Sequence, residues 1–426
     1  MGKRYIDKNV YEAAMERIAY CFEEFPQVLV AFSGGKDSGV LLNLCLQYVR
    51  DNDLLDCLSV YHIDYEAQYQ MTTDYVAETF AALPERVGKY WICIPCKVPC
   101  STSMYQDHWR PWQPDLRDIW VRPMPTYPYV INAEAAEFDW SAWDYDMQEA
   151  FCSWLSARFG GGLCCLTGVR SDESLNRLSA ITSAQKVNQH SGLCWLSDRQ
   201  GYALGHPLYD WAVEDIWTAN AKFGFAYNRL YDLFYQAGVS IHKARVASPF
   251  LDYAKGSLHL YRAIDPDNWG RMVSRVNGVN FTGIYGSTAA MGWRSITKPD
   301  HFTWQQYMYF LLDTLPDDTR ENYYRKLEVS IKFWRDHGGV LPQETVAELP
   351  NGIVSVQRQG DKLAARFVDY PDDLPEVTDF KSVPSYKRMC VCILKNDHTC
   401  KYMGFTATKR EAEKRRKAVE KWSNLL

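Results

Sequence analysis

The sequence has no apolar run of the roughly 18 to 20 residues that a bilayer-spanning helix needs. Its first residues, MGKRYIDKNVYEAAMER, also lack the apolar stretch of a secretory signal peptide. Both absences argue against a membrane or exported protein, so we expect a cytoplasmic protein without membrane partners.

A strong excess of charge is absent too, because 52 acidic side chains stand against 47 basic ones, for a net charge of -5. Any nucleic-acid contact must therefore come from a local basic patch. The 13 cysteines are an odd number in a chain without an export signal, which favours reduced thiols over a disulfide framework. Hydrophobic residues make up 47% and charged residues 23%, which is ordinary globular usage and argues against wholesale disorder.

Short apolar runs alternate with helical patterns over the first 250 residues. The predicted strands cover residues 27–32, 58–63, 90–94 and 162–167. This alternation predicts an α/β fold with a doubly wound, mostly parallel sheet and helices on both faces. A Trp- and Pro-rich stretch at residues 95–143 interrupts the pattern, and we expect it to form an ordered insertion over the sheet.

The alternation ends near residue 250, where helical patterns at residues 304–314 and 320–336 replace it. The predicted division is a nucleotide-binding domain at residues 1–250, followed by a mainly helical accessory domain at residues 251–380. Residues 381–426 are predicted to form a hairpin, around the alternating segment MCVCIL, and a basic C-terminal helix.

A glycine-rich loop lies between the first predicted strand and a helix. Its residues are Ser33, Gly34, Gly35, Lys36, Asp37 and Ser38. Consecutive glycines let backbone amides turn inward, the serines add hydroxyl donors, and the following helix presents its positive end to an anion. The pattern predicts a phosphate cradle, although the spacing matches neither the P-loop of nucleoside triphosphatases nor the dinucleotide fingerprint.

Two further blocks follow later in the chain. The block GVRSDES after the fourth predicted strand contains Gly168, Arg170, Glu173 and Ser174, and Arg177 comes next. The block HPLYDW at residues 206–211 precedes the segment EDIW. Together with SGGKDS, these blocks resemble the adenine nucleotide alpha-hydrolase-like (N-type ATP pyrophosphatase) superfamily. The resemblance covers roughly residues 25–250 and is strongest to the branch of phosphoadenosine phosphosulfate (PAPS) reductases, the sulfate adenylyltransferase small subunit and DndC. The later part resembles the IbrA-like group, whose founding member is named an immunoglobulin-binding regulator.

The resemblance implies an ATP pyrophosphatase or adenylyltransferase that splits ATP between its α- and β-phosphates. The implied catalytic residues are Lys36, Asp37 and Arg170. The loop would hold the pyrophosphate, Arg170 would meet the α-phosphate, and Asp37 would orient Lys36 or bind Mg²⁺ through water. The implied nucleotide contacts are Ser33, Gly34, Gly35, Lys36, Asp37, Ser38, Asp64, Gly168, Arg170, Glu173, Ser174 and Arg177. The resemblance also implies a ParB/sulfiredoxin-like protein partner.

Structural interpretations remain open for several of these residues. Arg170, Glu173 and Arg177 could form an ordinary salt-bridged helix start. Asp64 follows the second predicted strand, where it could contact the nucleoside or simply cap the strand.

The cysteines allow two metal-site hypotheses. Cys390, Cys392, His398 and Cys400 could bind zinc, although a hairpin without metal is favoured. A second possible zinc site consists of Cys93, Cys96, Cys100 and His108. Burial of these cysteines without metal is favoured, because Cys93 lies in a predicted strand. The adjacent Cys164 and Cys165 lie within a predicted strand, so their side chains should pack on opposite faces as core.

The C-terminal stretch at residues 381–421 carries twelve Lys or Arg and four acidic residues, a local charge of +8. It could bind DNA or RNA, or it could end in an ordinary solvated helix. The favoured hypothesis remains an ATP-dependent enzyme acting on an unidentified acceptor. Its rivals are a nucleotide-sensing regulatory module that contacts DNA or a transcription partner, and a sulfonucleotide reductase. The reductase is disfavoured because the reductases' C-terminal ECGLH-like motif is missing and no cysteine lies between Cys194 and Cys390.

Overall fold

The structure is a computed structural model that describes residues 6–173, 177–178, 181, 188–246, 248–285, 296–350, 352–359, 362–378 and 382–405. It divides into two compact units. The first unit contains residues 1–98, 109–249 and 260–275, and the second contains residues 99–108, 250–259 and 276–426. The division predicted from the sequence, with boundaries at residues 250 and 380, stays a prediction.

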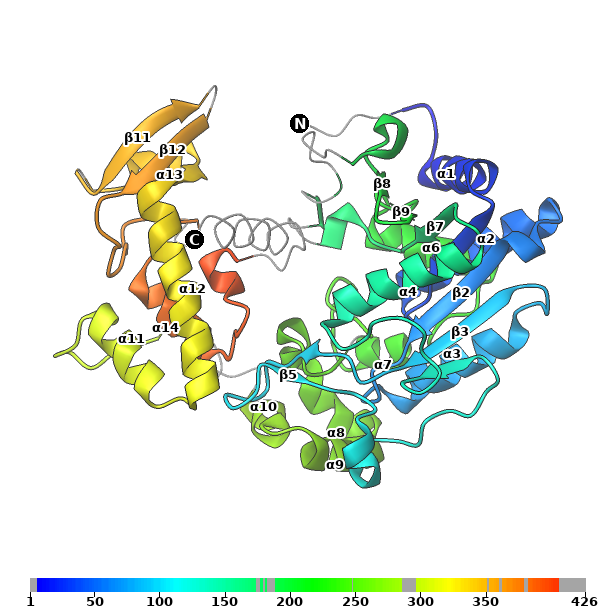
Figure 1. Cartoon of the computed structure of the whole chain (residues 1–426), viewed down its shortest axis with the longest axis horizontal. Coiled ribbons are helices and arrows are strands. Elements are labelled where there is room, and N and C mark those ends of the chain that lie inside the picture. The colour runs from blue at the N-terminus through cyan, green and yellow to red at the C-terminus, as the bar shows by residue number, and fades with distance from the viewer. Residues whose placement is uncertain are drawn as a thin grey trace, which may run out of the picture. The chain divides into compact units, whose positions relative to one another are not determined.

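A seven-stranded sheet with the order β6-β3-β2-β1-β7-β9-β8 forms the centre of the first unit (Figure 1). Neighbouring strands run parallel from β6 to β9, and only β8 is antiparallel to its neighbour β9. The strands are β1 (Gln27–Ala31), β2 (Leu58–Ile63), β3 (Gly88–Cys93), β6 (Val130–Asn132), β7 (Leu163–Leu166), β8 (Leu196–Asp198) and β9 (Tyr202–Gly205).

Helices cover both faces of this sheet. Val28 and Val30 of β1 belong to the same buried cluster as Ile18 of the first helix. On the opposite face, the ring of Tyr61 lies 5.3 Å from that of Phe151 in the fourth helix. The predicted doubly wound α/β fold is therefore confirmed. The helices of this unit are α1 (Val10–Glu24), α2 (Lys36–Asp51), α3 (Gln70–Ala82), α4 (Asp144–Arg158), α6 (Val213–Phe223), α7 (Leu230–Gln236), α8 (Tyr261–Ile264) and α9 (Pro266–Arg275).

The second unit is mainly helical, as predicted, and adds a small antiparallel sheet with the order β10-β12-β11. Its elements are α10 (Val279–Tyr285), α11 (Trp304–Asp313), α12 (Asp317–Asp336), β10 (Gly339–Leu341), α13 (Gln343–Ala347), β11 (Val354–Gln359), β12 (Lys362–Phe367) and α14 (Tyr386–Leu394). The short strands β4 (Val98–Pro99) and β5 (His108–Trp109) form a separate ribbon. No helix among the described residues has the length and hydrophobicity to cross a membrane.

The predicted hairpin around MCVCIL is wrong, because this segment lies in helix α14. Ser385 caps the helix by accepting a hydrogen bond from the Arg388 amide at 3.2 Å. Met389, Cys390 and Ile393 all pack into the core of the second unit. A short apolar run that is buried on most sides has no periodicity that separates helix from strand, which explains the error. The predicted basic C-terminal helix lies outside the described residues.

Candidate functional site

The SGGKDS loop connects the carboxyl end of β1 to the first turn of α2. Gly34 has a φ of +74°, and a Cβ atom there would lie 2.8 Å from the Val76 side chain. Both the backbone angle and the space therefore require glycine. Helix α2 begins at Lys36, and no side chain caps it at Gly35, so its amides point toward the loop from a positive helix end.

Hydroxyl groups hold the loop in a closed turn. The hydroxyls of Ser33 and Ser38 lie 3.0 Å apart, and the Gly35 amide donates to the Ser33 hydroxyl at 3.3 Å. The Ser38 hydroxyl donates to the Gly35 carbonyl at 3.1 Å. The two serines predicted from the sequence thus shape the turn from within.

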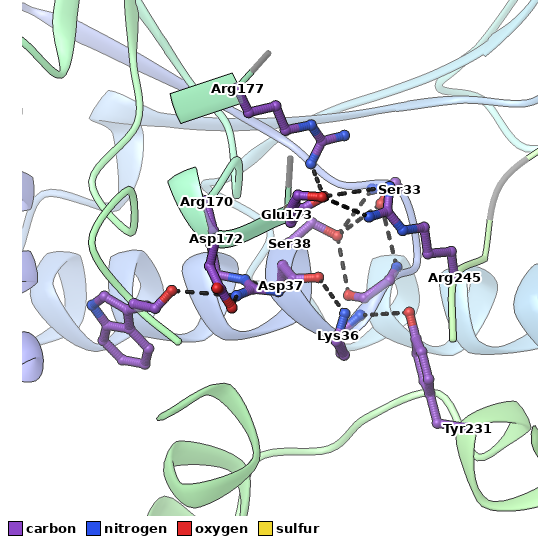
Figure 2. A network of polar contacts seen from close by, with 12 residues as sticks. Ser33, Lys36, Asp37, Ser38, Arg170, Asp172, Glu173, Arg177, Tyr231 and Arg245 are labelled. Atoms are coloured by element: carbon purple, nitrogen blue, oxygen red, sulfur yellow. Dashed lines mark hydrogen bonds and ion pairs between the residues drawn. The ribbon is translucent and has the colours of Figure 1, made fainter. Parts of the chain in front are cut away.

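Two cations from distant parts of the sequence converge on Asp37 (Figure 2). The Lys36 amine lies 2.8 Å from one carboxylate oxygen, and Arg170 Nε lies 2.6 Å from the other. Both cationic side chains are at least nine-tenths buried. The structure therefore brings the first and second sequence blocks together at one carboxylate.

The buried cations perturb one another. Burial lowers the pKa of the Lys36 amine below its usual 10.5, the positive charges of Arg170 and Arg245 lower it further, and Asp37 only partly offsets these effects. Keeping the Lys36 amine charged in this site therefore costs free energy. Binding of an anion next to the amine would offset that cost and is strongly favoured.

Gly168 explains how the second block reaches the loop. It follows β7, the strand next to β1, and a Cβ atom there would lie 2.8 Å from the backbone carbon of Asp37 and 2.9 Å from the Ser38 amide nitrogen. Only glycine permits this approach of backbone to backbone.

The third block, HPLYDW, positions Arg170. The Trp211 carbonyl accepts a hydrogen bond from Arg170 Nη1 at 3.2 Å, and the Tyr209 carbonyl accepts one from the Ser171 amide at 2.8 Å. Trp211 is itself anchored to α1, since its indole donates to the Val10 carbonyl at 3.0 Å. This block therefore acts on the site through Arg170.

Glu173 and Arg177 form an ion pair, as the interpretation of this block as an ordinary salt-bridged helix start requires. The pair also has a third member, because Arg245 Nη1 lies 3.7 Å from the same Glu173 oxygen. Ser174, the remaining predicted contact, lies outside the described residues.

Sequence reasoning missed the segment that closes the loop from the other side. The Tyr231 hydroxyl accepts a hydrogen bond from the Lys36 amide at 3.2 Å, and the Asn228 side chain donates to the Gly34 carbonyl at 3.1 Å. Arg245 belongs to this group. These residues lie about 190 to 210 positions after the loop and belong to no motif. The sequence offers one signal for them, a basic, aromatic stretch after the third block.

Asp64 lies at the end of β2 and is fully buried. One carboxylate oxygen pairs with Arg122 and accepts the Glu66 amide, and the other accepts the Trp91 indole at 2.7 Å. Burial alone would raise the pKa of Asp64, but Arg122 and the other partners bring it below its usual value. These contacts are those of a strand-end anchor, and a nucleoside contact by Asp64 stays a prediction.

Metal ligands do not converge in the described part of the chain, where no group of three His, Cys, Asp or Glu side chains could hold an ion. His398 Nε2 lies 2.9 Å from the Ser103 carbonyl, and the Cys390 thiol lies 3.6 Å from the Trp304 carbonyl. His398 and Cys390 thus contact different partners, whereas the thiol of Cys392 lies beside that of Cys400. Any Mg²⁺ at Asp37 would take most of its ligands from nucleotide phosphates and water.

None of the 13 cysteines forms a disulfide, and most are buried. Cys164 and Cys165 are fully buried, as predicted, and they face opposite layers: Cys164 packs in the cluster of α1 and α2, whereas the Cys165 thiol lies 3.9 Å from the Tyr61 hydroxyl. Cys93, Cys96 and Cys100 are buried too, and burial raises the pKa of each thiol. Such thiols are poor nucleophiles.

Comparisons with known proteins give one relative along nearly the whole chain. The uncharacterized protein YbdN of Escherichia coli (strain K12) is 33% identical over 410 residues, which cover 94% of this chain and 91% of YbdN. Residues 238–414 match the model of a domain of unknown function, DUF3440.

Solved structures give only partial likenesses. The PAPS reductase of Candida auris is 14% identical, with 55% of this chain and 94% of that chain covered and a TM-score of 0.27. The FMN adenylyltransferase of Candida glabrata with FMN and an ATP analogue is 16% identical, with 52% of this chain and 58% of that chain covered and a TM-score of 0.30. The U34-tRNA thiolase NcsA of Methanococcus maripaludis is 9% identical, with 66% of this chain and 82% of that chain covered and a TM-score of 0.31. With TM-scores below 0.5, these likenesses carry no conclusion about activity.

Proposed function

The chain belongs to the family of YbdN, and from this premise and the geometry of its glycine loop we propose that it is an ATP-dependent enzyme that cleaves between the α- and β-phosphates. The observation that carries the proposal is the convergence of Lys36 and Arg170 on Asp37 at the start of α2. It supplies two buried cations and a positive helix end at one point, which suits a polyphosphate.

The proposed step is attack of an acceptor oxygen on the α-phosphorus. A new P–O bond forms to the acceptor, the bond from the α-phosphorus to the bridging oxygen breaks, and the electron pair leaves with pyrophosphate. Loop amides and Lys36 would stabilise the charge that builds on pyrophosphate. Arg170 would meet the α-phosphate oxygens, for which a planar guanidinium is well shaped. Mg²⁺, when bound, would neutralise phosphate charge, with Asp37 reaching it through water.

The roles of the other residues follow from their places. Ser33 and Ser38 hold the turn, and Glu173 and Arg177 lie beside the loop. Gly34 and Gly35 leave room for neighbouring side chains, whereas Gly168 leaves room for the loop backbone. We keep Asp64 as a candidate nucleoside contact, in which case ligand binding would have to loosen one of its present partners.

The sequence-based rivals gain no support from a specific observation. A regulatory module that touches DNA or RNA through its tail depends on residues 406–426, which lie outside the described part. A sulfonucleotide reductase needs a reactive thiol, and burial raises the pKa of the thiols described above.

The test is to incubate the full chain with Mg²⁺ and ATP, with and without cell extract as a source of acceptor, and to identify the phosphate product. We expect pyrophosphate and AMP or an adenylylated product, with Lys36→Ala abolishing the release. The surface variant Lys8→Ala, which only loses an exposed pair with Glu16, is the matched control. Release of orthophosphate as the first product would refute the proposal.

A further inference from the structure

Glu173 lies between two arginines that come from different segments of the first unit. Arg177 pairs with one of its carboxylate oxygens, and Arg245 Nη1 lies 3.7 Å from the same oxygen. Arg245 Nη2 also donates to the Glu173 carbonyl at 3.4 Å. Figure 2 shows both guanidinium groups directed at this one carboxylate, next to the loop. One negative charge thus holds two positive charges in place.

The segment of Arg245 lies against the loop itself. The neighbouring side chain of Val246 would be 3.3 Å from a Cβ atom on Gly35. Tyr231, which accepts a hydrogen bond from the Lys36 amide, comes from the helix that precedes this segment. The charge of Arg245 also helps to lower the pKa of Lys36, so it is felt at the amine. Arg245 is therefore a member of the loop's electrostatic environment, although it belongs to no motif.

The ion pairs divide the site into two halves. Asp37 holds Lys36 and Arg170, whereas Glu173 holds Arg177 and Arg245. The first half is buried, but Arg177 and Arg245 are 39% and 33% exposed while Glu173 is 11% exposed. Partly exposed arginines can turn toward a ligand at small cost, and a phosphate presents more charge and more acceptor oxygens than one carboxylate.

We propose that Arg245 binds the diphosphate end of the nucleotide together with Arg177, and that Glu173 is an internal competitor that neutralises both arginines until the diphosphate displaces it. The inference rests on the proposed function, because it takes the loop to hold a diphosphate. It adds a binding residue from outside the three sequence blocks and gives Glu173 a positioning role through the arginines.

The experiment measures binding of pyrophosphate and of AMP to the full chain by titration calorimetry at fixed ionic strength. Arg245→Ala should weaken pyrophosphate binding about tenfold, the loss expected for one charge-assisted contact. Arg245→Lys should recover part of that loss, and AMP binding should not change. Glu173→Gln should instead tighten pyrophosphate binding, because it releases both arginines. Arg229→Ala, which removes a 70% exposed arginine from the same unit, is the control.

The two variants are expected to change pyrophosphate affinity in opposite directions, which distinguishes this inference from a merely structural role of Arg245. If Arg245 only braces Glu173 in the fold, Arg245→Ala and Glu173→Gln should shift pyrophosphate affinity in the same direction, and that result would overturn the inference. Unchanged affinity in Arg245→Ala would overturn it as well, even if Glu173→Gln did not fold. Failure of the unaltered chain to bind pyrophosphate would instead overturn the proposed function, on which this inference depends.

Discussion

Gly168→Ala should deform the phosphate loop from the strand next to it. The added Cβ atom would lie 2.8 Å from the Asp37 carbonyl carbon and 2.9 Å from the Ser38 amide nitrogen, whereas ordinary contacts lie at 3.4–4 Å. Both neighbours are backbone atoms at the start of α2, so no side-chain rotation can relieve the clash. Either the loop moves away from β7 or the strand end moves, and overpacking of this kind typically costs about 1–3 kcal/mol.

The same strain should appear in binding. If the loop relaxes in the unliganded variant, a diphosphate must push it back, and a penalty of about 1–3 kcal/mol corresponds to roughly 5- to 150-fold weaker binding. Urea denaturation monitored by circular dichroism would give the change in stability, and calorimetric titration with pyrophosphate would give the change in affinity.

The matched control is Gly270→Ala in α9, where a Cβ atom would meet no heavy atom within 4 Å. It should leave pyrophosphate affinity unchanged and stabilise the helix by up to about 1 kcal/mol, because alanine favours helix over glycine. If Gly168→Ala behaved like this control in both assays, the close approach of the second block to the loop would be refuted.

Two pH-dependent predictions follow from buried charges. Lys36→Met should raise the free energy of unfolding at neutral pH, because the pKa of Lys36 is below 10.5 and its charged form destabilises the fold there. The gain should fade as the pH rises through the lowered pKa of Lys36 and past 10.5, because well above 10.5 the amine of the unaltered chain is neutral in both states. Urea denaturation at pH 7 and pH 11 checks this, and a variant less stable at pH 7 would contradict it. Burial raises the pKa of Asp144, at the start of α4, to about 6, so its ionised form is the unfavourable one. Asp144→Asn should therefore stabilise the chain at pH 8 and lose that gain near pH 4, and a gain that grew on acidification would contradict the sign.

Much of the fold could be predicted because its signals are local. Continuous apolar runs mark β1 and β2 as strands covered on both faces, and the loop after β1 combines residues that a plain turn does not need. The approach of Arg170 to Asp37 was also within reach, since parallel neighbouring strands end at the same edge of the sheet. The boundaries of these elements follow from short-range patterns in the sequence.

The rest could not be predicted because it depends on contacts over long sequence distances. Tyr231 and Arg245 reach the loop through a segment without periodicity or motif. The engagement of Asp64 by Arg122 depends on the path of the insertion, which no local rule fixes. The helix α14 was mistaken for a strand because its apolar residues are buried on most sides.

Glu66 carries a consequence for any attempt to isolate the sheet. This fully buried carboxylate follows β2 with a φ of +63°, and Arg275 neutralises it through Nε at 2.9 Å. Arg275 ends α9 and belongs to the first unit, although it comes after the sequence position where the strand–helix alternation stops. A fragment cut at residue 250 would remove the cation that pairs with this carboxylate and leave it with the amides of Trp112 and Val121 as donors. Breaking a buried ion pair by removing one partner commonly costs about 3–5 kcal/mol. An autonomous form of the sheet should therefore extend at least to Arg275 at the end of α9.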